Sequence, residues 1–167
     1  MTCMFIKDIG FTGLAGAGKN AAAELLMEFG WEHMAFADPI KEIAQFQFAW
    51  NQDKDAKGRR LLQELGSAGR NYKINFWVDK ARARLFQVPR VVWTDVRFQN
   101  EVDFIKEERK GLIIRIERAG LKAGSHESEL GQSSLKGVDY TVQNDGTIQE
   151  LQTKIINILL QHGKVPK

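Results

Sequence analysis

Short apolar runs and longer amphipathic stretches alternate along the chain. Five runs are predicted to be strands, and they span residues 5–12, 31–37, 90–95, 111–116 and 138–142; the apolar run at 90–95 is expected to be a buried central strand. Between most of these runs, apolar residues recur at helical spacing, which predicts helices at about residues 20–29, 38–50, 75–86, 100–109 and 147–159. Strands that alternate with helices favour an α/β fold, with a parallel sheet and helices on both of its faces.

Capping residues predict where three of the helices begin. Asp38 is interpreted as an N-cap, with Pro39 at the first helical position. Asn100 is expected to cap the helix that follows the third strand. Thr147 and Glu150 have the spacing of a capping box, in which each side chain bonds to the backbone N–H of the other residue.

Two stretches lack a clear pattern. Residues 51–60 are polar and charged, and we interpret them as a mobile connector. Residues 61–65 resume a helix that we expect to stop near Gly66 or Gly69, because glycine is unfavourable inside helices. Residues 118–136 are rich in Gly, Ser and Lys, which predicts a loop after the fourth strand.

Length and charge limit the classes of protein. The 167 residues suit one domain, and the net charge of +3 suits a small anionic ligand. The basic residues are scattered, which argues against nucleic acid as a partner. Cys3 is the only cysteine, so an internal disulfide is excluded. The lack of a membrane-length apolar run and of a signal-peptide pattern predicts a cytoplasmic protein.

The stretch GLAGAGK at 13–19 carries the clearest chemistry. It fits the phosphate-loop pattern, in which backbone N–H groups surround a chain of phosphates and the lysine ammonium reaches the outer ones. A glycine turn before a helix is the alternative, but the predicted strand before it and helix after it favour the phosphate loop. The expected nucleotide contacts are Gly13, Leu14, Ala15, Gly16, Ala17, Gly18, Lys19, Asn20 and Ala21.

The loop departs from the pattern at one point. The residue after the lysine is usually Ser or Thr, whose hydroxyl ligates Mg²⁺. Here Asn20 and Ala21 follow Lys19, and neither offers a hydroxyl. The amide oxygen of Asn20 is a candidate metal ligand, together with the carboxylate of Asp95 at the end of the third predicted strand. For Asp95, the alternative is a cap on the following turn.

Several cations are candidates for phosphate binding. Arg97 and Arg70 can each clamp a phosphate with two N–H groups. A surface ion pair with Glu101 is the alternative for Arg97. Arg118 and Lys122 follow the fourth strand, where they can reach a transferring phosphoryl group or form a solvated loop.

Three further side chains are candidates for substrate contacts. Asp38 can accept a hydrogen bond from substrate, and Lys41 lies one helical turn further on. Trp77 can stack on a base, although an aromatic residue in such a stretch is more often part of a core. Each of four features follows the end of a predicted strand, and we expect them to converge on one edge of the sheet. They are the phosphate loop, Asp38, Asp95 and the 118–130 segment.

These motifs resemble, in matching order, those of the bacteriophage deoxynucleoside monophosphate kinases. The shared stretches cover nearly the whole chain and lie at residues 13–20, 36–41, 62–66, 95–101, 126–129 and 144–147. The specific ones are DVRFQNE at 95–101 and HESE at 126–129. The loop of that family commonly reads Gly-Lys-Asp-Thr, so Asn20 and Ala21 depart from it and leave direct metal ligation in doubt.

The resemblance implies a three-layer P-loop kinase fold in one domain over residues 1–167. It implies an acceptor-binding helical region at about 38–88 and a small lid at about 117–136. ATP and Mg²⁺ are the implied cofactors, and a deoxynucleoside monophosphate is the implied acceptor. The catalytic candidates are Lys19, Asp38, Asp95, Arg97 and Arg118. The acceptor-binding candidates are Asp38, Lys41, Gln63, Arg70, Trp77, Arg97, His126 and Glu129.

Two other functions stay open. A related P-loop kinase with another acceptor, such as dephospho-coenzyme A, would share the loop and the Asp38 region. The other is a nucleotide-binding switch without catalysis, and the observation that supports it is the missing hydroxyl after Lys19. In either case we expect a small-molecule nucleotide as partner, no membrane, and a homodimer.

Overall fold

The computed structural model describes residues 7–122, 124, 126 and 130–162. The chain divides into two compact units. Unit 1 comprises Met1–Met34 and Val88–Lys167, and unit 2 comprises Ala35–Gln87. Each unit is described by itself.

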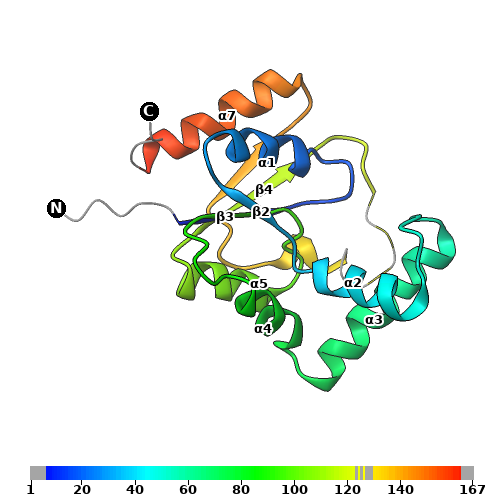
Figure 1. Cartoon of the computed structure of the whole chain (residues 1–167). Coiled ribbons are helices and arrows are strands. Elements are labelled where there is room, and N and C mark those ends of the chain that lie inside the picture. Colours follow the sequence, from blue (N-terminus) through cyan, green and yellow to red (C-terminus); the bar gives the residue numbers. More distant parts are fainter. Residues whose placement is uncertain (1–6, 123, 125, 127–129, 163–167) are drawn as a thin grey trace. The chain divides into compact units, whose positions relative to one another are not determined.

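The described part of unit 1 holds a parallel five-stranded sheet in the order β2-β3-β1-β4-β5 (Figure 1). Its strands are β1 (Asp8–Thr12), β2 (Glu32–Met34), β3 (Val91–Trp93), β4 (Leu112–Glu117) and β5 (Tyr140–Gln143). The predicted α/β class and parallel sheet are therefore confirmed. The second strand is shorter than the predicted 31–37, and the fifth begins at Tyr140 rather than at residue 138.

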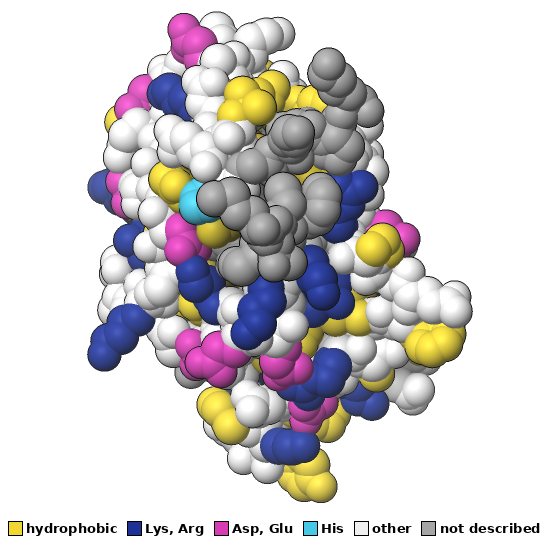
Figure 2. All heavy atoms as spheres, turned by 90° about the vertical axis from the view of Figure 1, so that its left-hand side faces the viewer, with side chains coloured by type: hydrophobic (Ala, Val, Ile, Leu, Met, Phe, Trp, Pro, Cys, Tyr) yellow, Lys and Arg dark blue, Asp and Glu magenta, His cyan; other side chains and the backbone are white. Residues whose placement is uncertain are grey.

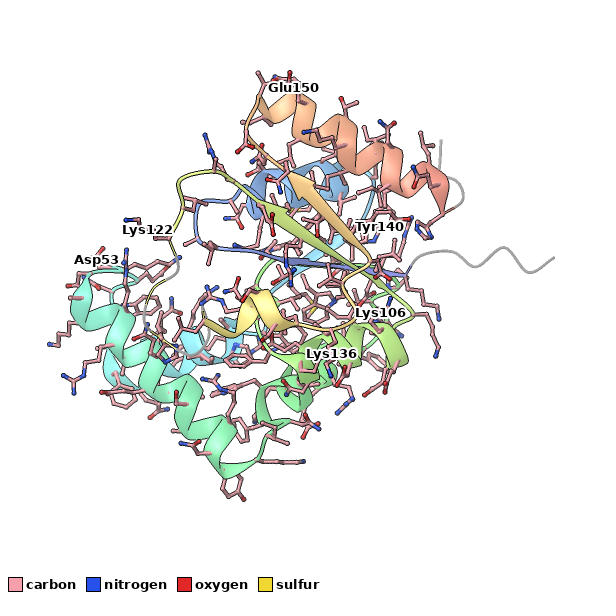
Figure 3. All side chains as sticks on the ribbon, turned by 180° about the vertical axis from the view of Figure 1, so that it is seen from behind. Asp53, Lys106, Lys122, Lys136, Tyr140 and Glu150 are labelled. Atoms are coloured by element: carbon pink, nitrogen blue, oxygen red, sulfur yellow. The ribbon has the colours of Figure 1, made fainter. Side chains whose placement is uncertain are left out.

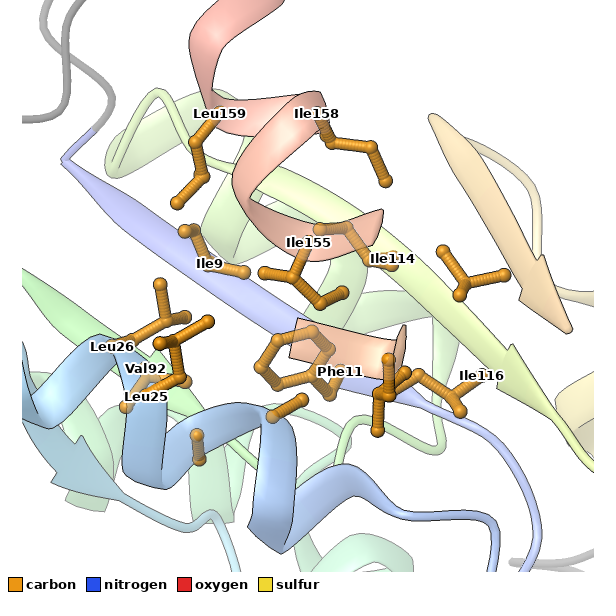
Figure 4. Close-up of a cluster of buried hydrophobic side chains, with 14 of the residues drawn as sticks. Ile9, Phe11, Leu25, Leu26, Val92, Ile114, Ile116, Ile155, Ile158 and Leu159 are labelled. Atoms are coloured by element: carbon orange, nitrogen blue, oxygen red, sulfur yellow. The ribbon is translucent and has the colours of Figure 1, made fainter. Parts of the chain in front are cut away.

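Helices α1 (Lys19–Glu28) and α7 (Ile148–Gln161) cover one face of the sheet. Figure 4 shows Phe11 and Ile114 of the strands among Leu26 of α1 and Ile155 of α7. These four side chains are fully buried, so the apolar stripes read from the sequence do form the core. The capping box of α7 is also confirmed, because Thr147 N donates to Glu150 Oε2 at 2.9 Å and Glu150 N to Thr147 Oγ1 at 3.2 Å.

Helix α5 (Gln99–Asp103) and the π-helix η1 (Phe104–Glu108) cover the other face. At Gly10 of β1, an added Cβ would lie 2.8 Å from Ile105 Cδ1, so this face of the sheet is tightly packed against η1. A buried carboxylate fastens the end of this segment, because Asp8 accepts hydrogen bonds from Arg109 at 2.8 and 2.9 Å and from Trp93 Nε1 at 2.9 Å. Unit 1 is thus a three-layer α/β/α structure.

The helix predicted at 100–109 differs in detail. Phe98, not Asn100, is the N-cap, and Asn100 is the second helical residue. The helix then changes from α to π geometry at Phe104. The N-cap residue Phe98 has no side chain that can cap the helix. Instead, the carboxylate of Glu101, the third helical residue, accepts a hydrogen bond from Phe98 N at 3.1 Å.

Unit 2, which the structure describes throughout, consists of helices α2 (Asp38–Phe48), α3 (Ala56–Tyr72) and α4 (Phe76–Ala83) with their connections. The N-cap of α2 is Ala37, so the prediction that Asp38 is the N-cap was wrong by one residue. Asp38 instead begins the helix, and its Oδ2 accepts a hydrogen bond from Ala35 N at 2.8 Å.

The predicted connector at 51–60 is correct only for residues 51–55, because α3 begins at Ala56, and the predicted stop near Gly66 or Gly69 was wrong. Asp55 caps α3 by accepting a hydrogen bond from Gly58 N at 2.7 Å, and the helix continues to Tyr72. Both glycines are contact points for Trp77 of α4: its Nε1 donates to Gly66 O at 2.8 Å, and its ring lies where a Cβ on Gly69 would be only 2.6 Å away.

Among the described residues, no helix is both long and apolar enough to cross a membrane. On the face seen in Figure 2, Lys and Arg side chains lie interspersed with Asp and Glu.

Candidate active site

The loop Gly13–Lys19 connects the carboxyl end of β1 to the first residue of α1. Gly13 and Gly18 have φ values of 136° and 109°, which L side chains rarely adopt. At Gly13 an added Cβ would lie 2.2 Å from Ile116 O, so only glycine allows the loop to pass this close to β4. Within the described residues, no side chain caps the start of α1, and the N-terminus of a helix is a favourable place for an anion.

Lys19 lies across this loop. Its Nζ donates to the carbonyl oxygens of Gly13 at 2.6 Å and Leu14 at 2.8 Å. The ammonium is therefore held over the start of the loop by local contacts. Asn20, the candidate metal ligand, is exposed on the first turn of α1, and Ala21 is half-buried.

Two buried amide side chains brace the loop from distant parts of the chain. Asn144, which follows β5, donates from Nδ2 to Ala17 O at 2.8 Å. Gln132, on the 3₁₀-helix η2 (Gly131–Ser134), accepts a hydrogen bond from Gly13 N at 3.2 Å through Oε1. Sequence reasoning assigned neither residue to the site, although Asn144 begins the stretch 144–147 that resembles the kinase family.

The segment 94–98 leaves β3 at the same edge of the sheet, because β1 and β3 are neighbouring parallel strands. Thr94 is buried and its hydroxyl lies 2.8 Å from His33 Nε2 on β2. Val96 N donates to Phe11 O at 3.2 Å, which joins the segment to β1. Asp95 and Arg97, the two candidates on this segment, are both half-buried.

Glu101 is the buried acidic residue of this region, with 6% of its surface exposed. Its Oε2 accepts hydrogen bonds from Arg97 N at 2.7 Å and Phe98 N at 3.1 Å. Burial first, and then the charge of Asp95, raise the pKa of Glu101 to about 8, although these hydrogen bonds and the Arg97 charge act in the opposite direction. Glu101, which was considered as a surface ion-pair partner of Arg97, is buried and contacts the backbone N–H of Arg97.

A cavity of about 530 Å³ lies beside the phosphate loop within unit 1. Its walls come from the loop, from the end of β4 with the residues after it, and from η2. They include Leu14, Ala17, Arg118, Leu121, Leu130, Gln132 and Gln143. The volume is in the range of small-molecule sites, and a mostly apolar wall beside an anion site suits a nucleoside attached to phosphates.

The residues after β4 are only partly described. Arg115 Nη2 donates to Gln132 O at 2.8 Å, which fixes η2 to the sheet. Arg118 and Lys122 are exposed, and Figure 3 shows Lys122 on the segment that follows β4. His126 is half-buried, whereas Glu129 lies outside the described residues.

The remaining candidates belong to unit 2. Asp38 Oδ1 forms an ion pair with Lys41 Nζ at 2.9 Å. Arg70 Nη2 donates to Ser67 Oγ at 3.2 Å on α3, where Gln63 is half-buried. Trp77 is 5% exposed and packs on α3, which is the core role considered for it; its stacking on a base stays a prediction.

The strand order and the glycine loop after β1 define this protein as a P-loop kinase by fold. Shikimate kinase from Acinetobacter baumannii is similar over 95% of both chains, with a TM-score of 0.53 and 16% identity. Dephospho-CoA kinase from Campylobacter jejuni is similar over 95% of this chain and 98% of its own, with a TM-score of 0.52 and 13% identity. At these identities the similarity shows the fold alone.

Sequence comparison identifies the family. No family model matches the chain. A protein of Acanthamoeba polyphaga mimivirus, named "Putative deoxynucleotide monophosphate kinase", is 31% identical over 185 aligned positions, which cover 89% of this chain and 94% of that protein. The chain belongs to the deoxynucleotide monophosphate kinase family.

Proposed function

We propose that this protein transfers the γ-phosphoryl group of ATP to the 5′-phosphate of a deoxynucleoside monophosphate, which yields the diphosphate and ADP. The observation that carries the proposal is the phosphate loop, with Lys19 held over it and the N-terminus of α1 directly behind it. Membership of the family supplies the acceptor, since the mimivirus relative is named for deoxynucleotide monophosphates.

In this mechanism an oxygen of the acceptor phosphate attacks the γ-phosphorus in line, and the bond from that phosphorus to the β,γ-bridging oxygen breaks. The loop N–H groups and Lys19 hold the donor phosphates. Arg97 and Arg70 hold the acceptor phosphate, and Arg118 stabilises the charge of the transferring group. Catalysis consists of positioning and charge stabilisation, without a covalent intermediate.

Mg²⁺ fits the oxygen donors present. Within the described residues no group of three or more His, Cys, Asp or Glu could hold a metal ion, which suits an ion that arrives with the nucleotide phosphates. Asp95 and Asn20 would hold it, each with one oxygen or through water. When bound, the ion neutralises charge on the β- and γ-phosphate oxygens.

We assign the cavity beside the loop to the ribose and base of ATP. Its volume of about 530 Å³ and its leucine side chains support this assignment. Asp38, Lys41, Gln63 and Trp77 of unit 2, with His126 and Glu129, are assigned to the acceptor. We also propose a cytoplasmic homodimer that acts on free nucleotides and not on nucleic acid, and we retain the phage source that the resemblance implies.

The test is ADP release with ATP and Mg²⁺ against a panel of acceptors. The panel contains dTMP, dGMP, dCMP and dAMP, the matching ribonucleotides, and dephospho-coenzyme A. We expect at least one deoxynucleotide to stimulate ADP release by about a hundredfold or more over ATP alone.

Other outcomes separate the alternatives. Stimulation by dephospho-coenzyme A alone would identify a different acceptor for the same chemistry. Tight ATP binding without stimulation by any acceptor would contradict the kinase and favour the nucleotide-binding switch. In that case Asn20 and Ala21 would be the first positions to restore, as Thr or Ser, in search of the lost activity.

A further inference from the structure

The segment that carries Asp95 and Arg97 is held on two sides. On one side, Val96 N donates to Phe11 O at 3.2 Å, which fixes the segment to the central strand β1. On the other side, one carboxylate oxygen of Glu101 accepts from both Arg97 N and Phe98 N, at 2.7 and 3.1 Å. The backbone at Arg97 therefore depends directly on the Glu101 side chain.

Helix capping does not account for this arrangement. The chain contains an ordinary glutamate cap at Glu150, which is exposed and whose carboxylate accepts a hydrogen bond from the N-cap residue of α7, Thr147. Glu101 has the same third position in α5, but it is buried and also reaches the residue before the N-cap. Its bond to Arg97 is the shorter of the two, so the extra contact is at least as well formed as the cap itself.

Burying a carboxyl group is unfavourable unless hydrogen bonds compensate for lost hydration. A surface glutamate would cap α5 without that cost, as Glu150 does for α7. The position of Glu101 is explained if the placement of Arg97 matters to function, because a displacement of about 1 Å in a group that holds substrate can lower turnover about a hundredfold.

We propose that Glu101 is a positioning residue for the acceptor phosphate, which it serves by fixing the backbone from which the Arg97 guanidinium extends. This inference rests on the proposed function, in which Arg97 binds that phosphate. Glu101 acts through hydrogen-bond acceptance. Glutamine, which keeps a carbonyl oxygen at the same reach, should therefore replace it, whereas alanine and aspartate should not.

The experiment compares Glu101→Ala, Glu101→Gln and Glu101→Asp with the matched cap variant Glu150→Ala. KM is measured for ATP and for the deoxynucleotide, among dTMP, dGMP, dCMP and dAMP, that gives the highest kcat/KM with the wild-type protein. ATP affinity is also measured directly by equilibrium titration, and folding by circular dichroism. We expect Glu101→Ala and Glu101→Asp to raise the acceptor KM about tenfold or more and to leave ATP affinity within about threefold.

Glu101→Gln should stay within about threefold of the wild type for both substrates, and Glu150→Ala should change neither KM. If Glu101→Ala does not fold, the contrast between the Asp and Gln variants carries the test. The proposal is overturned if folded Glu101→Asp keeps the wild-type acceptor KM, if Glu101→Gln loses acceptor binding as alanine does, or if ATP affinity falls in parallel. A wild-type protein that uses no deoxynucleotide would instead contradict the proposed function.

Discussion

Lys19 is the residue on which we expect donor binding to depend most directly. Its ammonium already lies over the loop, bonded to the carbonyls of Gly13 and Leu14, where it can exchange these bonds for phosphate oxygens. Lys19→Ala should lower kcat/KM for ATP about a hundredfold or more, because a charge-stabilising donor is lost from the transferring group. ADP release measures this, with the exposed Lys136→Ala as the matched control.

We expect the fold to survive Lys19→Ala, since the bonds from Lys19 Nζ to Gly13 O and Leu14 O are local contacts within the loop. An unchanged melting temperature with wild-type turnover would remove Lys19 from the mechanism and, with it, the assignment of the loop to ATP phosphates.

Glu101 links protonation to the stability of unit 1. Its pKa is raised from 4.5 to about 8 in the folded protein, so the folded state binds this proton more tightly than the unfolded state. The resulting stabilisation is fully present below the unfolded pKa and is lost as the pH rises through about 8. Between about pH 5 and about pH 8, the free energy of unfolding should therefore fall by about 2–4 kcal/mol through this group.

Urea unfolding of the nucleotide-free protein across this pH range measures the effect. Glu101→Gln cannot titrate, so its stability should fall less steeply with pH than that of the wild type. Identical slopes for the two proteins would show that burial does not perturb the carboxyl group.

At the scale of single residues, the sequence predicts the part of the site that is local. The loop glycines and Lys19 lie within a single motif, so their spacing reveals their chemistry. Two distant residues support the same loop. Asn144 lies 127 residues from its partner Ala17, and Gln132 lies 119 residues from its partner Gly13. No spacing rule connects such residues, because the folded sheet alone brings them together.

Among the elements, α3 and α4 show how packing overrides a local preference. Gly69 lies within α3 because the Trp77 ring occupies the space of its missing Cβ, with atoms only 2.6 Å from that point. Gly69→Ala should destabilise unit 2 by about 1–3 kcal/mol, since overpacking exceeds the gain in helix propensity. Thermal and urea unfolding would detect this loss.

Gly131→Ala is the control for that change, because no atom of the described residues lies within 4 Å of its added Cβ. A stabilised Gly69→Ala protein would mean that Trp77 yields easily and that helix propensity decides the outcome.

The elements that the sequence predicts well are those with complete local signals. Helix α7 has a capping box at Thr147 and Glu150 followed by an apolar stripe, and both were predicted correctly. The stop predicted at Gly69 failed because the ring that makes glycine necessary belongs to the next helix. A glycine by itself does not distinguish a helix end from a close packing contact.

For the whole molecule, alternation of strands and helices predicts a parallel sheet but not the order of its strands. β3 lies between β2 and β1, although unit 2 separates β2 from β3 in the sequence. Because β3 pairs with β1 in the sheet, the Asp95 segment that follows β3 leaves the sheet beside the loop that follows β1. The candidate site in unit 1 therefore depends on a topological choice for which no short motif gives a signal.

The two units lead to a last prediction, in which donor and acceptor binding are separable by mutation. We assign Arg70 of α3 to the acceptor phosphate, whereas the residues proposed to bind ATP, at 13–21 and around the cavity beside the loop, lie in unit 1. Arg70→Ala should raise the KM of the deoxynucleotide about tenfold or more and leave ATP affinity within about threefold, because a guanidinium is lost from one substrate only.

Arg60→Ala is the matched control, since Arg60 lies on the same helix, is exposed, and pairs with Glu64 at 2.7 Å. Equal effects of the two variants would exclude Arg70 from the acceptor site, and a fall in ATP affinity with Arg70→Ala would contradict the division of binding between the units.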